Sequence, residues 1–137
     1  MQIIADANPV ISLIIKPNKS TVDLLFLEEL EIFAPELLFD EIERNKDIII
    51  KKSGMTDKEL NKFLAILKIR INIIPEEEFM KFKNESKEIC PDEKDIAYFA
   101  LALYLKCAVW SNEKNLKEQK KINVYATHEL IKMFGIK

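Results

Sequence analysis

The chain has 137 residues, of which 48% are hydrophobic, enough to build the core of one domain and too few for two domains of ordinary size. With 32% charged residues and only two glycines, the composition indicates dense secondary structure with short polar connections rather than disorder. The formal net charge of −2 argues against a protein that coats nucleic acid, since such proteins are usually strongly basic. It leaves open an enzyme that binds phosphate groups locally through metal ions.

The cysteines and the single histidine restrict the kinds of site further. Cys90 and Cys107 lie far apart without CxxC spacing, and His128 is near neither, so a zinc centre is disfavoured. Cysteines used in this way are expected to be free thiols in a reducing compartment. The first residues carry no basic leader, and no apolar run approaches the ~18 residues of a membrane span. A cytoplasmic protein with no membrane segment is therefore expected.

The first half of the chain alternates predicted strands and helices. An apolar run over residues 2–5 predicts a buried strand that stops at Asp6. Asn8 and Pro9 are expected to be the N-cap and first residue of a helix that ends near Ile15. The elements predicted next are a helix over 21–30, a strand over 31–34, a helix over 35–51, a helix over 57–68 capped by Thr56, and a strand over 71–74.

The second half continues the alternation and predicts the fold class. A surface helix is expected over 76–87, a strongly apolar helix over 92–106, strands over 107–110 and 122–126, and a helix that is capped by Thr127 and ends near Gly135. Alternating strands and helices predict an α/β fold: a single domain over 1–137, built as a three-layer αβα sandwich with a central, mostly parallel sheet. In such sheets, ligands bind beyond the carboxyl ends of the strands.

Two acids of the first half are candidates for a site at that edge. Asp6 ends the first strand among apolar neighbours, where a buried carboxylate needs a compensating partner, although Asp is also common in turns and caps. Glu41 falls within an apolar arc of the helix predicted over 35–51, and could alternatively pair with a lysine from another element. The arc consists of Leu37, Leu38, Ile42, Ile48 and Ile49.

The segment CPDEKD over residues 90–95 precedes the most apolar helix and contains two further acids. Asp92 is well explained as the N-cap, with Asp95 three residues later at the position of its capping partner. Asp95 also shares a helix face with Phe99 and Ala102, so its carboxylate is expected to point toward packed structure. The N-terminus of the helix favours its ionised form.

Glu113 is the fourth candidate, because it follows the strand predicted over 107–110. It could be an ordinary loop acid, and Ser111 could be a hydrogen-bonding support or a cap. Carboxylates without a neighbouring histidine or cysteine are typical ligands of Mg²⁺ or Mn²⁺, which activate water for attack on phosphodiesters. The sequence therefore predicts a centre for Mg²⁺ or Mn²⁺ formed by Asp6, Glu41, Asp95 and Glu113.

Four segments together resemble the PIN domain family, which includes the VapC-type toxins of toxin–antitoxin pairs. They occur in the family's order and are IIADANPVI over 3–11, PELLFDEI over 35–42, DEKDIAYFALA over 92–102 and VWSNEKNL over 109–116. The resemblance implies a metal-dependent endoribonuclease that hydrolyses RNA with Mg²⁺ or Mn²⁺. It also implies a homodimer and, for toxin members, a small antitoxin protein as partner.

The resemblance assigns roles to individual residues. The four acids named above match the family's acids in order, Asn8 matches a polar partner of the first acid, and Ser111 matches the hydroxyl residue before the last acid. Two positions depart from the pattern: Glu113 stands where Asp is usual, and Asn115 stands where many members have another Asp. Either departure implies a weaker second metal site or activity with one ion.

Lysines near the last acid suggest a path for RNA. They steer phosphates toward this edge, or alternatively form a solvated helix face. These lysines are Lys114, Lys117, Lys120 and Lys121.

Three alternative functions remain to be compared. A phosphotransferase of the haloacid dehalogenase type needs a second Asp two residues after the first, where this chain has Asn8. A receiver-like phosphoacceptor domain needs paired acids before its acceptor strand. A catalytically weak PIN-fold interaction module is opposed by the four retained acids and favoured by the departures at Glu113 and Asn115.

Overall fold

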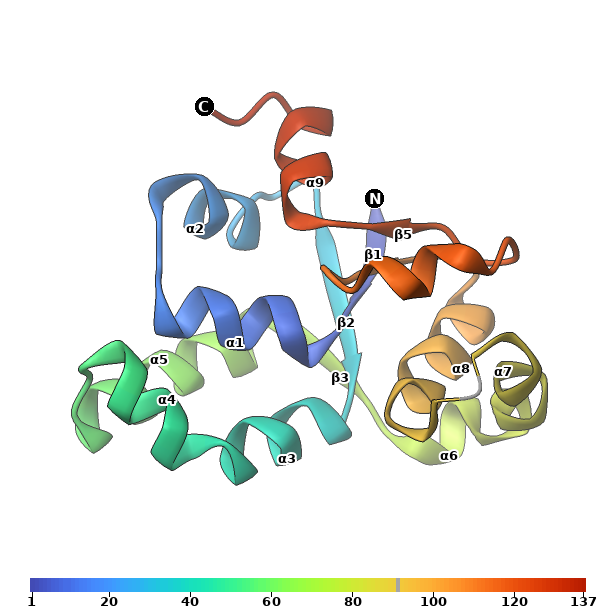
Figure 1. Ribbon diagram of the computed structural model, residues 1–137, viewed down its shortest axis with the longest axis horizontal. Coiled ribbons are helices and arrows are strands. Elements are labelled where there is room, and N and C mark those ends of the chain that lie inside the picture. Colours follow the sequence, from blue (N-terminus) through green and yellow to red (C-terminus); the bar gives the residue numbers. More distant parts are fainter. Residues whose placement is uncertain (91) are drawn as a thin grey trace.

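The computed structural model describes residues 1–90 and 92–137. Its strands form one parallel sheet in the order β3-β2-β1-β4-β5, with helices packed on both faces (Figure 1). The strands are β1 (Gln2–Ala5), β2 (Glu31–Pro35), β3 (Ile71–Ile74), β4 (Ala108–Trp110) and β5 (Val124–Tyr125). The predicted α/β class with a three-layer αβα arrangement is confirmed.

The helices divide into two layers because the chain reverses its direction across the sheet. It first moves outward from β1 through β2 to β3, with the connecting helices on one face, and then returns to β4 with the next helices on the other. The first layer contains α1 (Ala7–Ile15), α3 (Leu37–Arg44), α4 (Lys46–Ser53) and α5 (Asp57–Arg70), and α2 (Lys19–Leu25) follows α1. The second contains α6 (Glu76–Phe79), η1 (Met80–Phe82), α7 (Lys83–Ile89), η2 (Glu93–Asp95) and α8 (Ile96–Leu105).

The chain ends with η3 (Lys114–Glu118), between β4 and β5, and with α9 (Thr127–Met133), which packs against α2. Within the described residues, none of the helices combines the length and apolarity that crossing a bilayer would require.

The central strand β1 lies at the topological switch point of the sheet. The connection from β1 leads to β2 on one side, whereas the connection from β4 leads to β5 on the other. Ile3, Ile4 and Ala5 of β1 are fully buried, and the backbone N–H of Asp6 still donates to the carbonyl of Trp110 at 3.0 Å. The carboxyl ends of β1 and β4 therefore place Asp6 beside the residues that follow Trp110.

The helix predicted over 35–51 is wrong as a continuous element. Pro35 ends β2, and the helix breaks at Asn45, whose side-chain amide donates to the carbonyl of Glu41 at 2.7 Å. The break turns α4 relative to α3, so that Ile48, expected on the buried arc, is 52% exposed while Ile49 is buried. Helical periodicity alone does not reveal a break at a polar residue whose side chain donates to a carbonyl in the last turn of the helix.

Two of the predicted caps are also wrong. Asp6, not Asn8, is the N-cap of α1, because its carboxylate accepts from the N–H of Ala7. Ala126, not Thr127, is the N-cap of α9, and the Thr127 hydroxyl instead accepts from the indole of Trp110 at 2.9 Å. The predicted cap at Thr56 is confirmed and forms a full capping box with Glu59.

Several predicted boundaries move. The helix expected over 21–30 spans Lys19–Leu25, because Asn18 caps it earlier by accepting from the N–H of Thr21. The helix expected over 76–87 is divided into α6, η1 and α7, and the one expected over 92–106 begins as the 3₁₀ turn η2. The strands expected over 107–110 and 122–126 shorten to β4 and β5.

Arg70, the last residue of α5, joins that helix to the turn between α2 and β2. Its guanidinium donates to the carbonyls of Leu25 and Leu30, and to that of Leu27 at 2.6 Å. The guanidinium carries several donors on one plane, so a single side chain can satisfy these three carbonyls together.

We expect Arg70→Ala to lower the free energy of unfolding by about 2–3 kcal/mol, since it leaves three carbonyls without their charged donor. Urea denaturation measures the change. The matched control is Arg44→Ala, an exposed arginine that forms no ion pair among the described residues, with an expected change within about 0.5 kcal/mol. Equal effects of the two substitutions would contradict this account.

Candidate metal centre

Asp6 lies at the junction between β1 and α1 and is 6% exposed. One carboxylate oxygen accepts from the N–H of Ala7 at 2.9 Å, and the other accepts from the Ser111 hydroxyl at 2.9 Å. Burial raises the pKa of Asp6 to about 6, against the lowering effect of the Ser111 hydrogen bond. Two hydrogen bonds thus compensate only part of the cost of burying this carboxylate.

Asp95 ends η2 and directly precedes α8, so the turn aims its side chain inward and leaves it only 3% exposed. Its Oδ2 atom is buried and has no hydrogen-bond partner in the part of the chain that the structure describes. Burial, followed by the negative charges of Glu113 and Asp6, raises the pKa of Asp95 to about 7. Such a carboxylate is costly to keep ionised unless a cation joins it.

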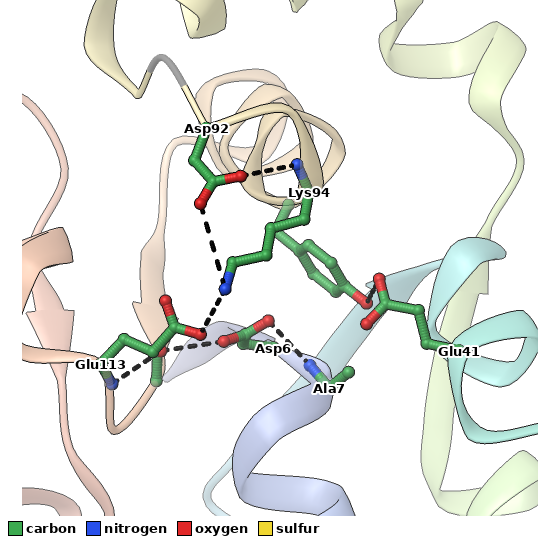
Figure 2. A network of polar contacts seen from close by, with 8 residues as sticks. Asp6, Ala7, Glu41, Asp92, Lys94 and Glu113 are labelled. Carbon is green, nitrogen blue, oxygen red and sulfur yellow. Dashed lines mark hydrogen bonds and ion pairs between the residues drawn. The ribbon is translucent and has the colours of Figure 1, made fainter. Parts of the chain in front are cut away.

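Glu113 reaches the same place from the loop after β4. Its backbone N–H donates to the Ser111 hydroxyl oxygen at 3.2 Å, so Ser111 connects Glu113 to Asp6. One carboxylate oxygen from each of Asp6, Asp95 and Glu113 lies within 4.8 Å of the others. We call these three residues the acidic trio; Figure 2 shows two of its members, Asp6 and Glu113, facing each other.

Glu41 lies next to the acidic trio rather than within it. It projects from α3, is half-buried, and faces the site from the side opposite Glu113 (Figure 2). The Tyr98 hydroxyl donates to its Oε1 atom at 3.1 Å. Burial raises the pKa of Glu41, the Tyr98 hydrogen bond lowers it in part, and the charge of Glu113 adds a smaller upward contribution. The sequence thus predicted four converging acids, and the structure groups three of them with the fourth at the rim.

The acidic trio fits a divalent cation. Its donors are all carboxylate oxygens, the hard ligands that Mg²⁺ and Mn²⁺ prefer. A cation among them would give the Oδ2 atom of Asp95 the partner that it lacks among the described residues and would offset the repulsion between the three charges.

The structure also places the supporting residues named from the sequence. Asn8 is exposed on α1, and the hydrogen bonds of Asp6 come from Ala7 and Ser111 instead. The carboxylate of Asp92 caps η2 by accepting from the N–H of Lys94 at 3.2 Å. The backbone N–H of Asp95, rather than its side chain, donates to the carbonyl of Asp92.

The lysines expected to guide RNA differ in their surroundings. Lys114, Lys120 and Lys121 are exposed, whereas the ammonium of Lys117 is held by Glu129 of α9. A paired ammonium is less available to a phosphate group than an unpaired one, so the ammonium of Lys114 is more accessible than that of Lys117.

Sequence patterns did not identify Lys94 and Tyr98, which contact the candidate acids. The Nζ atom of Lys94 lies 3.4 Å from Oε1 of Glu113 and 4.0 Å from Oδ2 of Asp92, and Tyr98 contacts Glu41 as described above. Tyr98 follows Asp95 by three positions, a spacing that puts both on one helix face and that could have identified it. Lys94 carries no comparable signal, since its reach depends on the geometry of η2.

We expect the metal-free protein to lose stability as the pH rises from about 4 to about 7, because the folded form holds protons on Asp6 and Asp95 that the unfolded chain has released. Asp95→Asn removes one of these groups. The variant should therefore be more stable than the native protein near pH 8, by about 1–3 kcal/mol after screening by solvent and Lys94, with the difference vanishing near pH 4.

Urea denaturation in the presence of a chelator measures both ends of this range. Asp40→Asn, which changes an exposed acid of α3, is the control and should leave the pH dependence unaltered. A lower stability of Asp95→Asn than of the native protein near pH 8 would show that burial does not strain this carboxylate.

Comparisons with known proteins agree with this architecture. The model of the PIN domain family matches residues 4–127. Among solved structures, the 2.2 Å resolution structure of VapBC-1 from nontypeable Haemophilus influenzae is similar, with a TM-score of 0.69 and 14% sequence identity. The match covers 93% of this chain and 99% of that chain, and at this identity it shows a shared fold. No curated protein matches the sequence.

Proposed function

This chain belongs to the PIN domain family, and we propose that it is a metal-dependent endoribonuclease that hydrolyses phosphodiester bonds of RNA. PIN domains are generally nucleases. The observation that carries the proposal is the acidic trio, in which three carboxylates from distant parts of the chain meet and a buried oxygen of Asp95 lacks a partner among the described residues.

In this proposal, Asp6, Asp95 and Glu113 hold one Mg²⁺ or Mn²⁺ ion. When bound, such an ion lowers the pKa of water and offsets the negative charge that develops on the phosphate group. The N–H of Ala7 and the hydroxyl of Ser111 orient the carboxylate of Asp6 and favour its ionised form. Asn115, exposed and uncharged, adds no carboxylate for a second ion.

In this proposal, Glu41 is the residue that accepts a proton. Its carboxylate is half-buried at the rim, its pKa is raised by burial, and the Tyr98 hydroxyl fixes one of its oxygens. A carboxylate in that position can accept a proton from water attacking the phosphate group, and Tyr98 holds it in the required orientation. Lys114 and the less available Lys117 lie on the η3 edge, where the backbone of RNA would pass.

The partners are proposed from the family and from the structural similarity. The similar solved structure is that of VapBC-1, and by this likeness we propose that the chain is the toxin of a toxin–antitoxin pair with a small antitoxin protein as partner. A homodimer and a cytoplasmic location complete the proposal. The second candidate is a catalytically weak interaction module with the same fold. It is favoured by Glu113, which stands where Asp is usual, and by Asn115, which stands where many members have another Asp.

We expect the native protein to cleave a mixed RNA pool only when Mg²⁺ or Mn²⁺ is present, and Asp6→Asn to reduce the rate more than about 100-fold, since even partners of metal ligands commonly contribute 10–100-fold. Asp40→Asn is the matched control and should cleave like the native protein, because Asp40 is exposed outside the acidic trio. Gel electrophoresis of end-labelled RNA measures the rates.

The outcomes separate the candidates. Equal cleavage by the native protein and Asp6→Asn would indicate a contaminating nuclease and defeat the proposal. Binding of the metal ion without cleavage by the native protein would favour the interaction module.

Mg²⁺ or Mn²⁺ should raise the melting temperature of the native protein, because a ligand that binds only the folded state stabilises it, by about 2.7 kcal/mol at a hundredfold excess over Kd. Asp95→Asn should lose most of this increase, whereas Asp40→Asn should keep it. Differential scanning fluorimetry measures the shift. An undiminished increase in Asp95→Asn would place the ion elsewhere on the molecule.

A further inference from the structure

Lys94 is the cation closest to the acidic trio. It lies in η2, and its Nζ atom is 3.4 Å from Oε1 of Glu113 and 4.0 Å from Oδ2 of Asp92, so it links η2 to the loop after β4 (Figure 2). The Lys94 side chain is 60% exposed, whereas that of Glu113 is 23% exposed. The ammonium therefore sits on the solvent side of the trio.

The charges around Lys94 indicate which contact dominates. Among the described residues, it is the one cation within ion-pair distance of any member of the trio. Its Nζ atom lies closer to Oε1 of Glu113, at 3.4 Å, than to Oδ2 of Asp92, at 4.0 Å. Glu113 is thus the main partner of Lys94, and it is also one of the three carboxylates that the trio offers to a divalent ion.

Both cations need the same carboxylate, and they repel each other at short range. A divalent ion held by the trio would draw Glu113 away from Lys94 and disfavour an ammonium next to it. Lys94 can leave without a large cost, since its side chain is mostly exposed and Asp92 lies within reach as a second acceptor. The contact is consequently one that a metal ion can displace.

We propose that Lys94 is an internal counter-ion that competes with the divalent ion for Glu113 and thereby weakens binding of the metal. This inference rests on the proposed function, since it concerns the regulation of the same centre. In the metal-free protein, the ammonium offsets part of the repulsion within the trio. Binding of the ion then requires the exchange of one cation for another at Glu113.

The test is a calorimetric titration of Mn²⁺ into the full chain without RNA. Lys94→Gln should bind Mn²⁺ about three- to tenfold more tightly than the native protein at low ionic strength, the range expected for losing one nearby, partly screened positive charge. Lys94→Arg keeps the charge and should bind like the native protein or more weakly. Lys52→Gln removes an exposed lysine of α4 as a control for net charge and should have no effect.

A double-mutant cycle with Glu113→Gln tests the route of the effect. If Lys94 acts by competing for Glu113, then Lys94→Gln should change the affinity for Mn²⁺ less than twofold once Glu113 is already replaced. The advantage of Lys94→Gln in the native background should also shrink in about 1 M salt, where the ammonium is screened. The melting temperature without metal confirms that each variant is folded.

Unchanged or weaker binding of Mn²⁺ by Lys94→Gln, in a native protein that does bind the ion, would overturn the role of Lys94 and leave the proposed function standing. An equal gain in the presence and absence of the Glu113 carboxylate would also overturn it. Failure of every variant, including the native protein, to bind Mn²⁺ would overturn the metal centre and this inference with it.

Discussion

The structure depends on one constraint, the burial of the Asp6 carboxylate where the central strand β1 ends. Its backbone continues the parallel ladder toward Trp110, while its side chain caps α1 and accepts from Ser111. Since the sheet reverses its connections at this point, the carboxyl ends of β1 and β4 lie at the same edge of the sheet. Helix α8 packs against these strands from the second helical layer. Asp95, directly before α8, and Glu113, in the loop after β4, therefore lie beside Asp6.

The buried carboxylates illustrate how a cluster of acids can oppose the stability of the fold that brings it together. Burial raises the pKa of Asp6 and of Asp95 above ordinary values. The negative charge of Glu113 raises both pKa values further, and the charge of Asp6 adds to the shift of Asp95. The apolar core, from fully buried Ile3 and Ile4 to Trp110, holds them together despite this repulsion. The fold thus tolerates unfavourable local electrostatics where the acidic trio meets, as expected where stability is traded for a proposed function.

Sequence patterns predicted the layers of the fold and the convergence of Asp6, Asp95 and Glu113, because both follow from simple periodicities and from the common edge at which parallel strands end. They did not predict the break at Asn45, because the helical spacing of apolar residues continues across this position. The break arises because the side-chain amide of Asn45 donates to the carbonyl of Glu41 at the end of α3. Asn8 and Asp6 are equally good capping residues by type, and only the backbone path selects Asp6. Lys94 was missed because its contact with Glu113 spans two elements that are not neighbours in sequence.

The hydrogen bond between Ser111 and Asp6 joins residues 105 positions apart, nearly the full length of the chain. Such a contact cannot form in a growing polypeptide until β4 has left the ribosome and inserted beside β1. A nascent chain that lacks its final strands therefore cannot assemble the trio. For a protein proposed to cut RNA, this order of assembly would withhold the complete trio until the loop after β4 has been synthesised.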